Sequence, residues 1–293
     1  MAPRIIILGC GFIGSHIART LSKNGSSYKS VSSTECDLTN LELVQRTFCD
    51  CDSNTSVVMT ACITRLRDNS YRGFNQNVLM AENLATFLRS HTVRNVIFLS
   101  SVDVYGLLEQ AKIIREDLPL NPDDYYAMSK LVSEFILTKA CSDQGIPLVI
   151  LRLTGVYGPG DDGKSTIWKL VRSALDQGVI SVYGDGQNVR DFIAVQDVVQ
   201  VILGLCETVT PRNQIINVAT GTSHTILEIA QYIAEIIPCR VELLPKPKEE
   251  NPKRAKVIHF DTMRLKTELP EFVPTDLCDG IRLYLNSINR HSA

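Results

Sequence analysis

Arg4-Ile5-Ile6-Ile7-Leu8-Gly9-Cys10-Gly11-Phe12-Ile13-Gly14 combines a strand-like apolar run with a glycine turn, and a helical pattern of apolar residues follows directly. Glycines permit a tight turn and let the backbone approach a pyrophosphate. The N-terminus of a helix offers free N–H groups and a partial positive charge to such an anion. The stretch therefore predicts a dinucleotide-binding strand–turn–helix unit. Its expected contacts with the dinucleotide come from Gly9, Gly11, Phe12, Ile13 and Gly14.

Strand and helix patterns alternate after this unit. Buried-strand patterns cover 56–61, 95–99, 147–153 and 214–218, and helical patterns cover 77–90 and 225–237. Thr39 and Glu42 are spaced as a helix capping box, which predicts that a helix begins there. Strands that alternate with helices are typical of a parallel sheet, so the sequence predicts a doubly wound α/β fold.

The bulk composition is that of an ordinary globular protein. The 293 residues are 44% hydrophobic and 21% charged, which suits one large core or two linked domains. A formal net charge of -2 gives no basic excess, so we expect a small-molecule partner and no nucleic acid. No apolar run reaches the ~18 residues of a membrane helix, so we expect no membrane partner.

The cysteines and the first residues indicate a compartment. Nine cysteines are scattered without a Cys-x-x-Cys pair, which indicates reduced thiols. The five histidines form no ligand spacing, and we predict no metal site. The first strand begins at Arg4, which leaves no room for the cleavage region of a signal peptide. These features together predict a cytoplasmic protein.

The stretch from Asp124 to Lys130 carries the main candidate for proton transfer. Asp124 follows a turn and is suited to a helix start, so Tyr126 and Lys130 would share one face of a helix. A cation beside a phenol favours the phenolate, which makes the tyrosine usable in proton transfer near neutral pH. A tyrosine four residues before a lysine is also common on ordinary helix surfaces, and the spacing alone leaves that reading open.

Ser101 is a second candidate, because it follows the strand pattern at 95–99. The sites of doubly wound sheets lie at the carboxyl ends of their strands, where Ser101 would present a hydroxyl. A serine at a strand end is also commonly a turn or cap residue. The position therefore supports a catalytic role only in combination with other residues.

The chain changes character beyond Leu153. The loop at 154–160 is too rich in glycine to continue a strand or a helix. Arg190 lies behind a further glycine turn, and it either clamps a phosphate or forms a surface salt bridge with a neighbouring aspartate. Arg254 lies in a tail rich in proline and lysine, and it either reaches an anionic substrate or is simply solvated.

The choice between NAD and NADP depends on the residues after the second strand. An acid there holds the ribose hydroxyls of NAD, and the stretch at 28–33 contains none. Ser32, Ser33 or Arg19 would accommodate a 2′-phosphate, or the serines are plain loop residues. We expect NAD and leave NADP open.

Taken together and in order, these stretches resemble the extended short-chain dehydrogenase/reductase family, which contains NAD-dependent nucleotide-sugar epimerases, dehydratases and reductases. The resemblance spans nearly the whole chain and implies a Rossmann domain with a smaller C-terminal substrate domain. It rests on 9–14, Asp37-Leu38, Asn77-Val78, Ser100-Ser101 with 104–106, 126–130, 156–159, and 184–186 with Arg190-Asp191-Phe192.

The resemblance implies roles for individual residues. Ser101, Tyr126 and Lys130 match the catalytic set of the family. Tyr126 would move the proton of a sugar hydroxyl while hydride moves to or from the nicotinamide. Lys130 would hold the nicotinamide ribose and lower the pKa of the phenol, and Ser101 would donate a hydrogen bond to the reacting oxygen.

The resemblance also implies the binding contacts. Asp37 and Leu38 match the pair that receives the adenine. Ser32 and Ser100 complete the expected contacts with the dinucleotide, in addition to Tyr126 and Lys130. Arg190 matches a ligand of the substrate phosphate.

Some positions depart from the family pattern. The short span from Ser33 to Asp37 resembles the reductase branch, whereas 184–192 resembles the epimerase and dehydratase branches. Gly155 replaces an asparagine that faces the substrate diphosphate in many relatives. Asp103 stands where dehydratases and decarboxylases have a glutamate. It is either an acid or base for C5 chemistry or a turn residue hydrogen-bonded to backbone, and we favour the turn residue.

We therefore expect an enzyme that acts at C4 of a nucleotide-linked hexose, with 4-epimerisation by transient oxidation as the first hypothesis. The alternatives are an NAD(P)H-dependent 4-keto sugar reductase, a 4,6-dehydratase and, outside enzymes, an NAD(P)-binding redox sensor. The Rossmann domain is expected over 1–157 with 191–219 returning to it, and the substrate domain over 158–190 and 221–293. The family commonly dimerises through the helices that contain Asn77 and Tyr126, so we expect a homodimer.

Overall fold

The computed structural model describes residues 3–106, 112–161, 163, 165–208, 214–245 and 258–289. Its centre is a six-stranded sheet in the order β11-β6-β4-β3-β1-β2. The strands are β1 (Arg4–Leu8), β2 (Tyr28–Val31), β3 (Thr55–Met59), β4 (Asn95–Ser101), β6 (Leu148–Leu153) and β11 (Gln214–Val218). Every neighbouring pair is parallel, which confirms the predicted doubly wound sheet.

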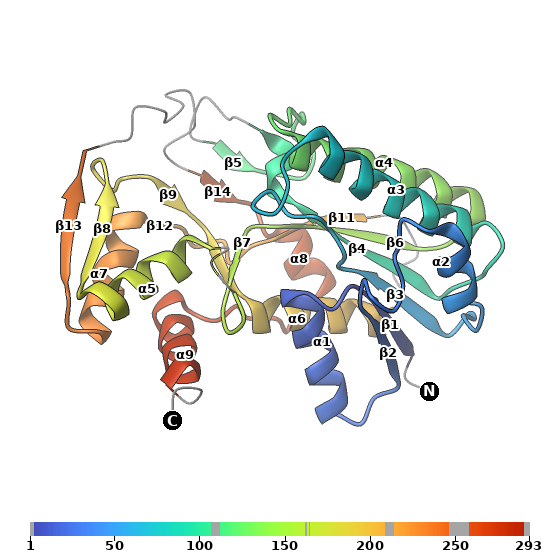
Figure 1. Cartoon of the computed structure of the whole chain (residues 1–293), viewed down its shortest axis with the longest axis horizontal. Helices are drawn as coiled ribbons and strands as arrows, with labels where there is room; N and C mark the ends of the chain where they lie inside the picture. The colour runs from blue at the N-terminus through green and yellow to red at the C-terminus, as the bar shows by residue number, and fades with distance from the viewer. Residues whose placement is uncertain are drawn as a thin grey trace.

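Helices cover both faces of this sheet (Figure 1). On one face lie α2 (Leu41–Thr47), α3 (Tyr71–Leu88) and α4 (Tyr125–Gln144), and on the other lie α1 (Phe12–Lys23), α6 (Val195–Glu207) and α8 (Met263–Glu268). The side chains of β1 alternate between the two cores: Ile6 and Leu8 pack under α2 and α3, whereas Ile5 and Ile7 pack under α1 and α6. Both faces are buried, so the strand has a continuous apolar sequence.

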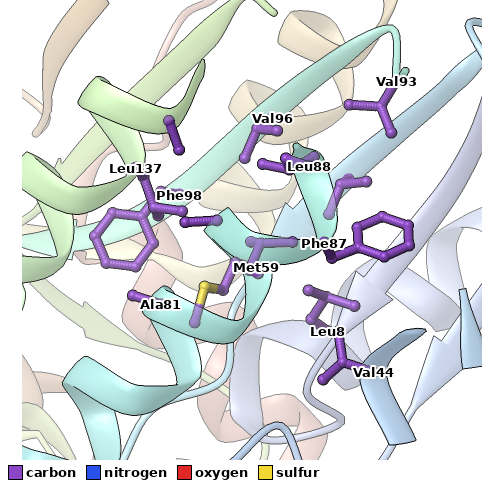
Figure 2. Close-up of a cluster of buried hydrophobic side chains, with 14 of the residues drawn as sticks. Leu8, Val44, Met59, Ala81, Phe87, Leu88, Val93, Val96, Phe98 and Leu137 are labelled. Atoms are coloured by element: carbon purple, nitrogen blue, oxygen red, sulfur yellow. The ribbon is translucent and has the colours of Figure 1, made fainter. Parts of the chain in front are cut away.

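Figure 2 shows part of the core under α2, α3 and α4. Phe87 and Leu88 at the end of α3 are each 1% exposed, and Met59 and Phe98 of the sheet are equally buried. Burial of side chains of this size contributes about 1.5–3 kcal/mol each. This packing fixes α3 and α4 against β3 and β4, and so fixes the loops at the carboxyl ends of those strands.

A second, smaller core lies beside the first, at the left of Figure 1. Its elements are α5 (Thr166–Gln177), β8 (Val179–Tyr183), α7 (Ile226–Ile236), β13 (Arg240–Leu244) and α9 (Leu277–Asn289). Tyr157 joins this core and fits against Gly280 of α9. A Cβ at Gly280 would lie 1.9 Å from the hydroxyl oxygen of Tyr157. Only glycine therefore lets α9 approach so closely.

Short strand pairs connect the two cores. They are β7 (Gly155–Tyr157) with β10 (Phe192–Ala194), β9 (Val189–Arg190) with β12 (His224–Thr225), and β5 (Lys112–Ile114) with β14 (Ile258–Phe260). The 3₁₀ helix η1 (Val102–Tyr105) follows β4 directly. Leu265 of α8 packs in the core under α1 and α6. We therefore propose the domain division expected from the sequence, with 258–269 added to the Rossmann part.

The starts of two helices differ from the predictions. The capping box at Thr39 and Glu42 was wrong, because Asn40 is the N-cap of α2 and its side chain accepts a hydrogen bond from Leu43 N at 3.1 Å. Thr39 instead donates its hydroxyl to Asp37 at 2.8 Å. Helix α3 begins at Tyr71, well before the predicted start at 77.

No helix in the described ranges combines the length and the apolar character that a membrane span requires.

Candidate active site

The strand order of the sheet reverses between β1 and β3. Ligands of such sheets bind outside the carboxyl ends of the strands at this point. Hydrogen bonds join the loops after β1 and β3 there. Thr60 Oγ1 donates to Gly9 O at 2.8 Å, and Ala61 N donates to Leu8 O at 2.7 Å. The topology therefore places the glycine turn at the expected crevice.

A cavity of about 740 Å³ occupies this crevice. Its walls bring together residues from the loops after β1, β2, β3 and β4 with residues of α4. Among them are Gly9, Gly11, Phe12, Ile13, Gly14, Ser32, Asp37, Leu38, Ser100, Ser101, Tyr126 and Lys130. These are all the residues that the sequence assigned to the dinucleotide and to the catalytic set.

The three glycines of the turn have different physical roles. Gly9 has φ +111°, a conformation that L side chains rarely adopt. A Cβ at Gly14 would lie 1.9 Å from Gly9 O, so Gly14 allows α1 to pack against the turn. A Cβ at Gly11 would meet no atom within 4 Å, and it would project into open space at the cavity wall. The open space at the N-terminus of α1 fits the pyrophosphate of a dinucleotide.

A carboxylate reaches the end of the second strand, although the stretch at 28–33 contains none. The carboxylate of Glu35 accepts hydrogen bonds from Ser32 N at 2.8 Å and from Ser32 Oγ at 2.7 Å. Both bonds lower the pKa of the Glu35 carboxyl, and the bond from the Ser32 backbone has the larger effect. An ionised acid is therefore hydrogen-bonded to Ser32, a residue of the cavity wall, although Glu35 itself is not among the wall residues.

Helix α4 positions Tyr126 and Lys130 on one face, as predicted. Asp124 is its N-cap, and the side chain accepts a hydrogen bond from Ala127 N at 2.7 Å. The ammonium of Lys130 lies 5.9 Å from the centroid of the Tyr126 ring. It donates to Leu99 O at 2.7 Å. The carbonyl at the end of β4 thus holds the lysine in place.

Ser101 ends β4 and caps η1. Its hydroxyl accepts a hydrogen bond from Asp103 N at 3.1 Å and donates to Asp103 Oδ2 at 3.1 Å. The same carboxylate oxygen lies 2.8 Å from Nη2 of Arg65. The carboxylate of Asp103 thus contacts two side chains, whereas the reading we favoured from the sequence had it bonded to backbone. Asp103 is not among the residues that form the cavity wall.

The pKa of the Tyr126 phenol is raised well above its usual value. Burial is the largest cause, because it disfavours the charged phenolate, and Cys62 and Asp103 act in the same direction. Arg65 and the hydroxyl of Ser101 lower the pKa of the phenol. The sequence led us to expect a lowered pKa beside Lys130, and burial outweighs that effect here.

A buried polar network lies behind the cavity. Ser100 donates its hydroxyl to Glu134, which forms an ion pair with Arg152 at 2.8 Å. The guanidinium carbon of Arg152 lies 4.9 Å from the centroid of the Tyr105 ring, and Tyr105 donates to Asn217 Oδ1 at 2.7 Å. The network joins α4, β4, β6 and β11. Within it, the proton of the Ser100 hydroxyl is donated to Glu134.

Sequence reasoning missed this network and Arg65, although two signals pointed to the network. Glu134 follows Lys130 by four residues, on the helix face that already carries Tyr126. Arg152 is a charged residue in an otherwise apolar strand, which normally requires a buried partner. Arg65 follows β3 at the carboxyl end of the sheet, and only the tertiary contacts show where its side chain lies.

Arg190, which was predicted to bind the substrate, is not among the residues of the cavity wall. Arg190 is in β9 beside His224 of β12, and its Nη1 donates to Val189 O at 2.7 Å. Arg254 lies outside the described residues. Gly155 opens β7, where a Cβ would lie 2.7 Å from the ring of Phe192. The aromatic ring therefore fills the space that a side chain at this position would need.

Within the described ranges, no three His, Cys, Asp or Glu residues come together in a cluster that suits a metal ion.

Residues 5–219 match the NAD dependent epimerase/dehydratase family. The chain belongs to this family, a group of the extended short-chain dehydrogenases/reductases, as its motifs had indicated. The proteins it matches are named as nucleotide-sugar epimerases, dehydratases, decarboxylases and reductases. Proteins of this family depend on NAD, and we propose that the dinucleotide binds in this cavity.

Individual relatives are distant. The chain is 27% identical to a putative UDP-glucose 4-epimerase of Methanocaldococcus jannaschii, over 95% of each chain. It is 28% identical to an uncharacterized UDP-glucose epimerase, YtcB, of Bacillus subtilis, over 55% of this chain and 50% of that protein. The fold matches a UDP-glucuronic acid 4-epimerase of Bacillus cereus, solved with UDP-glucuronic acid and NAD, with a TM-score of 0.82, 22% identity and coverage of 98% and 99%.

Proposed function

We propose that the chain catalyses NAD-dependent epimerisation at C4 of a nucleotide-linked hexose. The observation that supports this most is the convergence of Ser101, Tyr126 and Lys130 on a cavity whose walls include the glycine turn. The relative aligned over 95% of both chains is named as a putative UDP-glucose 4-epimerase, which supports the same activity.

The side chains of the protein have separate roles in this reaction. When bound, the nicotinamide supplies reversible hydride exchange with C4 of the sugar. Tyr126 accepts the proton of the C4 hydroxyl as phenolate, the form that Arg65 and the Ser101 hydroxyl stabilise against the effect of burial, and later returns it. Ser101 donates a hydrogen bond to the reacting oxygen, and Lys130 holds the nicotinamide ribose. Because oxidation and reduction both occur in one cycle, the cofactor stays bound and no net NADH accumulates.

The contacts of Asp103 favour epimerisation over 4,6-dehydration. Dehydration requires an acid or base that reaches the sugar near C5, and Asp103 occupies that place in the family pattern. Its carboxylate is paired with Arg65 at 2.8 Å and bonded to Ser101. A carboxylate held in this way contacts Arg65 and Ser101 of the protein, which does not suit proton transfer at C5.

Glu35 favours NAD over NADP. Its ionised carboxylate, bonded to Ser32 at 2.7 Å, would repel a 2′-phosphate and accept hydrogen bonds from a 2′-hydroxyl. Arg67, which lines the cavity, would favour a phosphate. We give Glu35 the larger weight, because its carboxylate is hydrogen-bonded to Ser32, the residue that follows β2.

Two arginines are candidates for holding the substrate. We assign Arg190 and Arg254 to the phosphates of a nucleoside-diphosphate sugar. Next to Arg190, the carboxylate of Asp191 accepts hydrogen bonds from Thr220 N at 3.0 Å and Gly221 N at 2.9 Å, so this segment is hydrogen-bonded to the loop after β11.

All nine cysteines lie in the described ranges as free thiols, which fits a reducing compartment such as the cytoplasm.

Incubation of the purified protein with UDP-, GDP- and dTDP-hexoses tests the proposal. We expect nuclear magnetic resonance to show a C4 epimer without accumulation of NADH. A reductase would instead consume NAD(P)H, a dehydratase would leave a 4-keto-6-deoxy product, and a redox sensor would bind NAD(P) without turnover. Extraction and identification of the bound dinucleotide tests the preference for NAD.

The assignment of Tyr126 is tested by a matched pair of variants. We expect Tyr126→Phe to lose about 10²-fold or more in turnover, because proton transfer through a positioned side chain contributes at least that much. It should still bind NAD, since the ring remains. Tyr125→Phe should keep activity, because Tyr125 is half-exposed on the outside of α4. The reverse pattern contradicts the assignment.

A further inference from the structure

Arg65 reaches from the loop after β3 over the ring of Tyr126. Its guanidinium carbon lies 5.6 Å from the centroid of that ring. Nη2 is 2.8 Å from Asp103 Oδ2, and Nε is 2.6 Å from Asp124 Oδ2. Two carboxylates, one from η1 and one from the N-cap of α4, therefore hold one guanidinium beside the phenol. The side chain of Arg65 is 35% exposed, so water screens the ion pairs only in part.

The loop that carries Arg65 is itself fastened to α3 and α4. Asn77, which is 5% exposed, accepts a hydrogen bond from Ile63 N at 2.7 Å and donates to Ile63 O at 2.9 Å. It also donates to Ser129 Oγ at 3.0 Å. On the other side of Arg65, the side-chain oxygen of Asn69 accepts from Tyr126 N at 3.0 Å. The position of the guanidinium thus depends on bonds on both sides of it in the chain.

Several charged and titratable groups face Tyr126. Arg65 and Asp103 act on the phenol in opposite directions, because a cation stabilises the phenolate and a carboxylate repels it. The burial of the ring adds to the effect of the carboxylate. The groups are Arg65 and Cys62 from the loop after β3, Ser101 and Asp103 from the end of β4 and η1, and Asp124 and Lys130 from α4.

We propose that Arg65 is a positioning residue of the reaction: held by Asp103 and Asp124, it stabilises the phenolate of Tyr126 and so sets the pH range of proton exchange. This rests on the proposed function, because it presupposes that Tyr126 moves a proton. Arg65 itself exchanges no proton, since a guanidinium stays charged in proteins. The phenolate oxygen takes the proton of the sugar hydroxyl, and the phenol gives it back.

The inference makes two predictions of opposite sign. Arg65→Gln removes the cation and leaves the Asp103 carboxylate unpaired, so the phenol of Tyr126 should ionise about one pH unit higher or more. Asp103→Asn removes a repelling charge while Asp124 still holds Arg65, so the phenol should ionise at lower pH. Arg65→Lys keeps a cation and should lie closer to the wild type than Arg65→Gln.

The ionisation of Tyr126 can be measured without turnover. The ultraviolet difference absorbance of tyrosinate is followed against pH on the full chain with NAD. The same titration of Tyr126→Phe is subtracted, which isolates the signal of Tyr126. Arg172→Gln is the matched control, because Arg172 pairs with Asp176 at 2.9 Å and lies 5.9 Å from the Trp168 ring on α5, in the second core. It should leave the titration unchanged.

The midpoints relative to the wild type decide the inference, and a wild-type protein that gives no Tyr126 signal before it unfolds overturns it. A midpoint in Arg65→Gln that equals the wild-type value or lies below it overturns the proposal. So does an Asp103→Asn midpoint that is not lower, or no Tyr126 signal from Asp103→Asn before the protein unfolds. If the shifts occur in a protein that turns over no nucleotide sugar, the proposed function fails while the electrostatic role of Arg65 stands. If epimerisation occurs without the shifts, the reverse holds.

Discussion

Gly11 and Gly14 belong to the same sequence motif but meet different surroundings. A Cβ at Gly14 would lie 1.9 Å from Gly9 O, a backbone atom that cannot move without disrupting the turn. A Cβ at Gly11 would meet nothing within 4 Å and would enter the space that a pyrophosphate needs. One glycine is therefore required by the fold and the other by the ligand.

This contrast gives a prediction. Gly14→Ala should lower the free energy of unfolding by about 1–3 kcal/mol or more, because the methyl group overpacks a rigid contact. Gly11→Ala should keep the thermal stability of the apo protein and lose roughly tenfold or more in NAD affinity, which corresponds to about 1.4 kcal/mol. Calorimetric melting and NAD titration of both variants check this. Equal melting temperatures for the two variants would contradict it.

Helices α3 and α4 share an apolar outer surface. The rings of Tyr71 and Tyr125 have centroids 6.3 Å apart, and the two side chains are 63% and 49% exposed. Met128 and Phe135, seven residues apart on α4, are also exposed, and so is Leu79 of α3. Contiguous apolar surface of this kind is typical of an interface between proteins. We propose that two copies of the chain pair through this surface, as the family pattern indicates.

Sedimentation velocity tests the pairing. The wild type should sediment as a dimer at micromolar concentration, and Phe135→Glu should shift it to a monomer, because the new carboxylate would be buried in the interface. Leu243→Glu is the control, since Leu243 is also apolar and exposed but lies on β13 of the second core. A wild-type protein that sediments as a monomer would rule out the dimer.

His16 joins α1 of the Rossmann part to the loop that leads to the second core. This residue of α1 is buried, and its Nε2 lies 2.7 Å from the carbonyl oxygen of Pro159, in the loop that leads to α5. Neutral imidazole with the proton on Nε2 donates to that carbonyl. Burial, the largest cause, lowers the pKa of the imidazole below the usual 6.5. The imidazolium form would also donate to Pro159 O, and this bond by itself raises the pKa, so it is the burial of the ring that favours the uncharged histidine.

The lowered pKa makes the stability of the whole protein depend on pH. The unfolded chain binds the proton more readily than the folded one, so the contribution of His16 is complete above pH 6.5 and is lost as the pH falls from there toward the folded pKa. His16→Gln, which keeps a donor but does not titrate, should flatten the melting temperature over this range. His259→Gln, at an exposed histidine, should leave it unchanged. An unaltered pH profile in His16→Gln would refute this link.

Local patterns in the sequence were sufficient for the framework. The apolar runs, the glycine turn and Asp124 as a helix start correctly predicted the parallel sheet, the strand–turn–helix unit at its start and the shared face of Tyr126 and Lys130. Such features depend on residues a few positions apart, whose geometry is set by strand and helix periods and by turn conformations. The missed start of α3 has a local cause as well: Gly73 and Asn75 weaken the helical pattern of its first turns.

The chemistry around Tyr126 depends on contacts between residues far apart in the sequence. Arg65 over the phenol, Glu134 with Arg152, and the 52-residue step from Asn77 to Ser129 all join different loops or elements. These contacts depend on the register of the strands and on how helices α3 and α4 pack on them, which no local pattern specifies. The sequence therefore predicted residues that line the cavity, and the packing of the sheet and its helices determined how their charges act on one another.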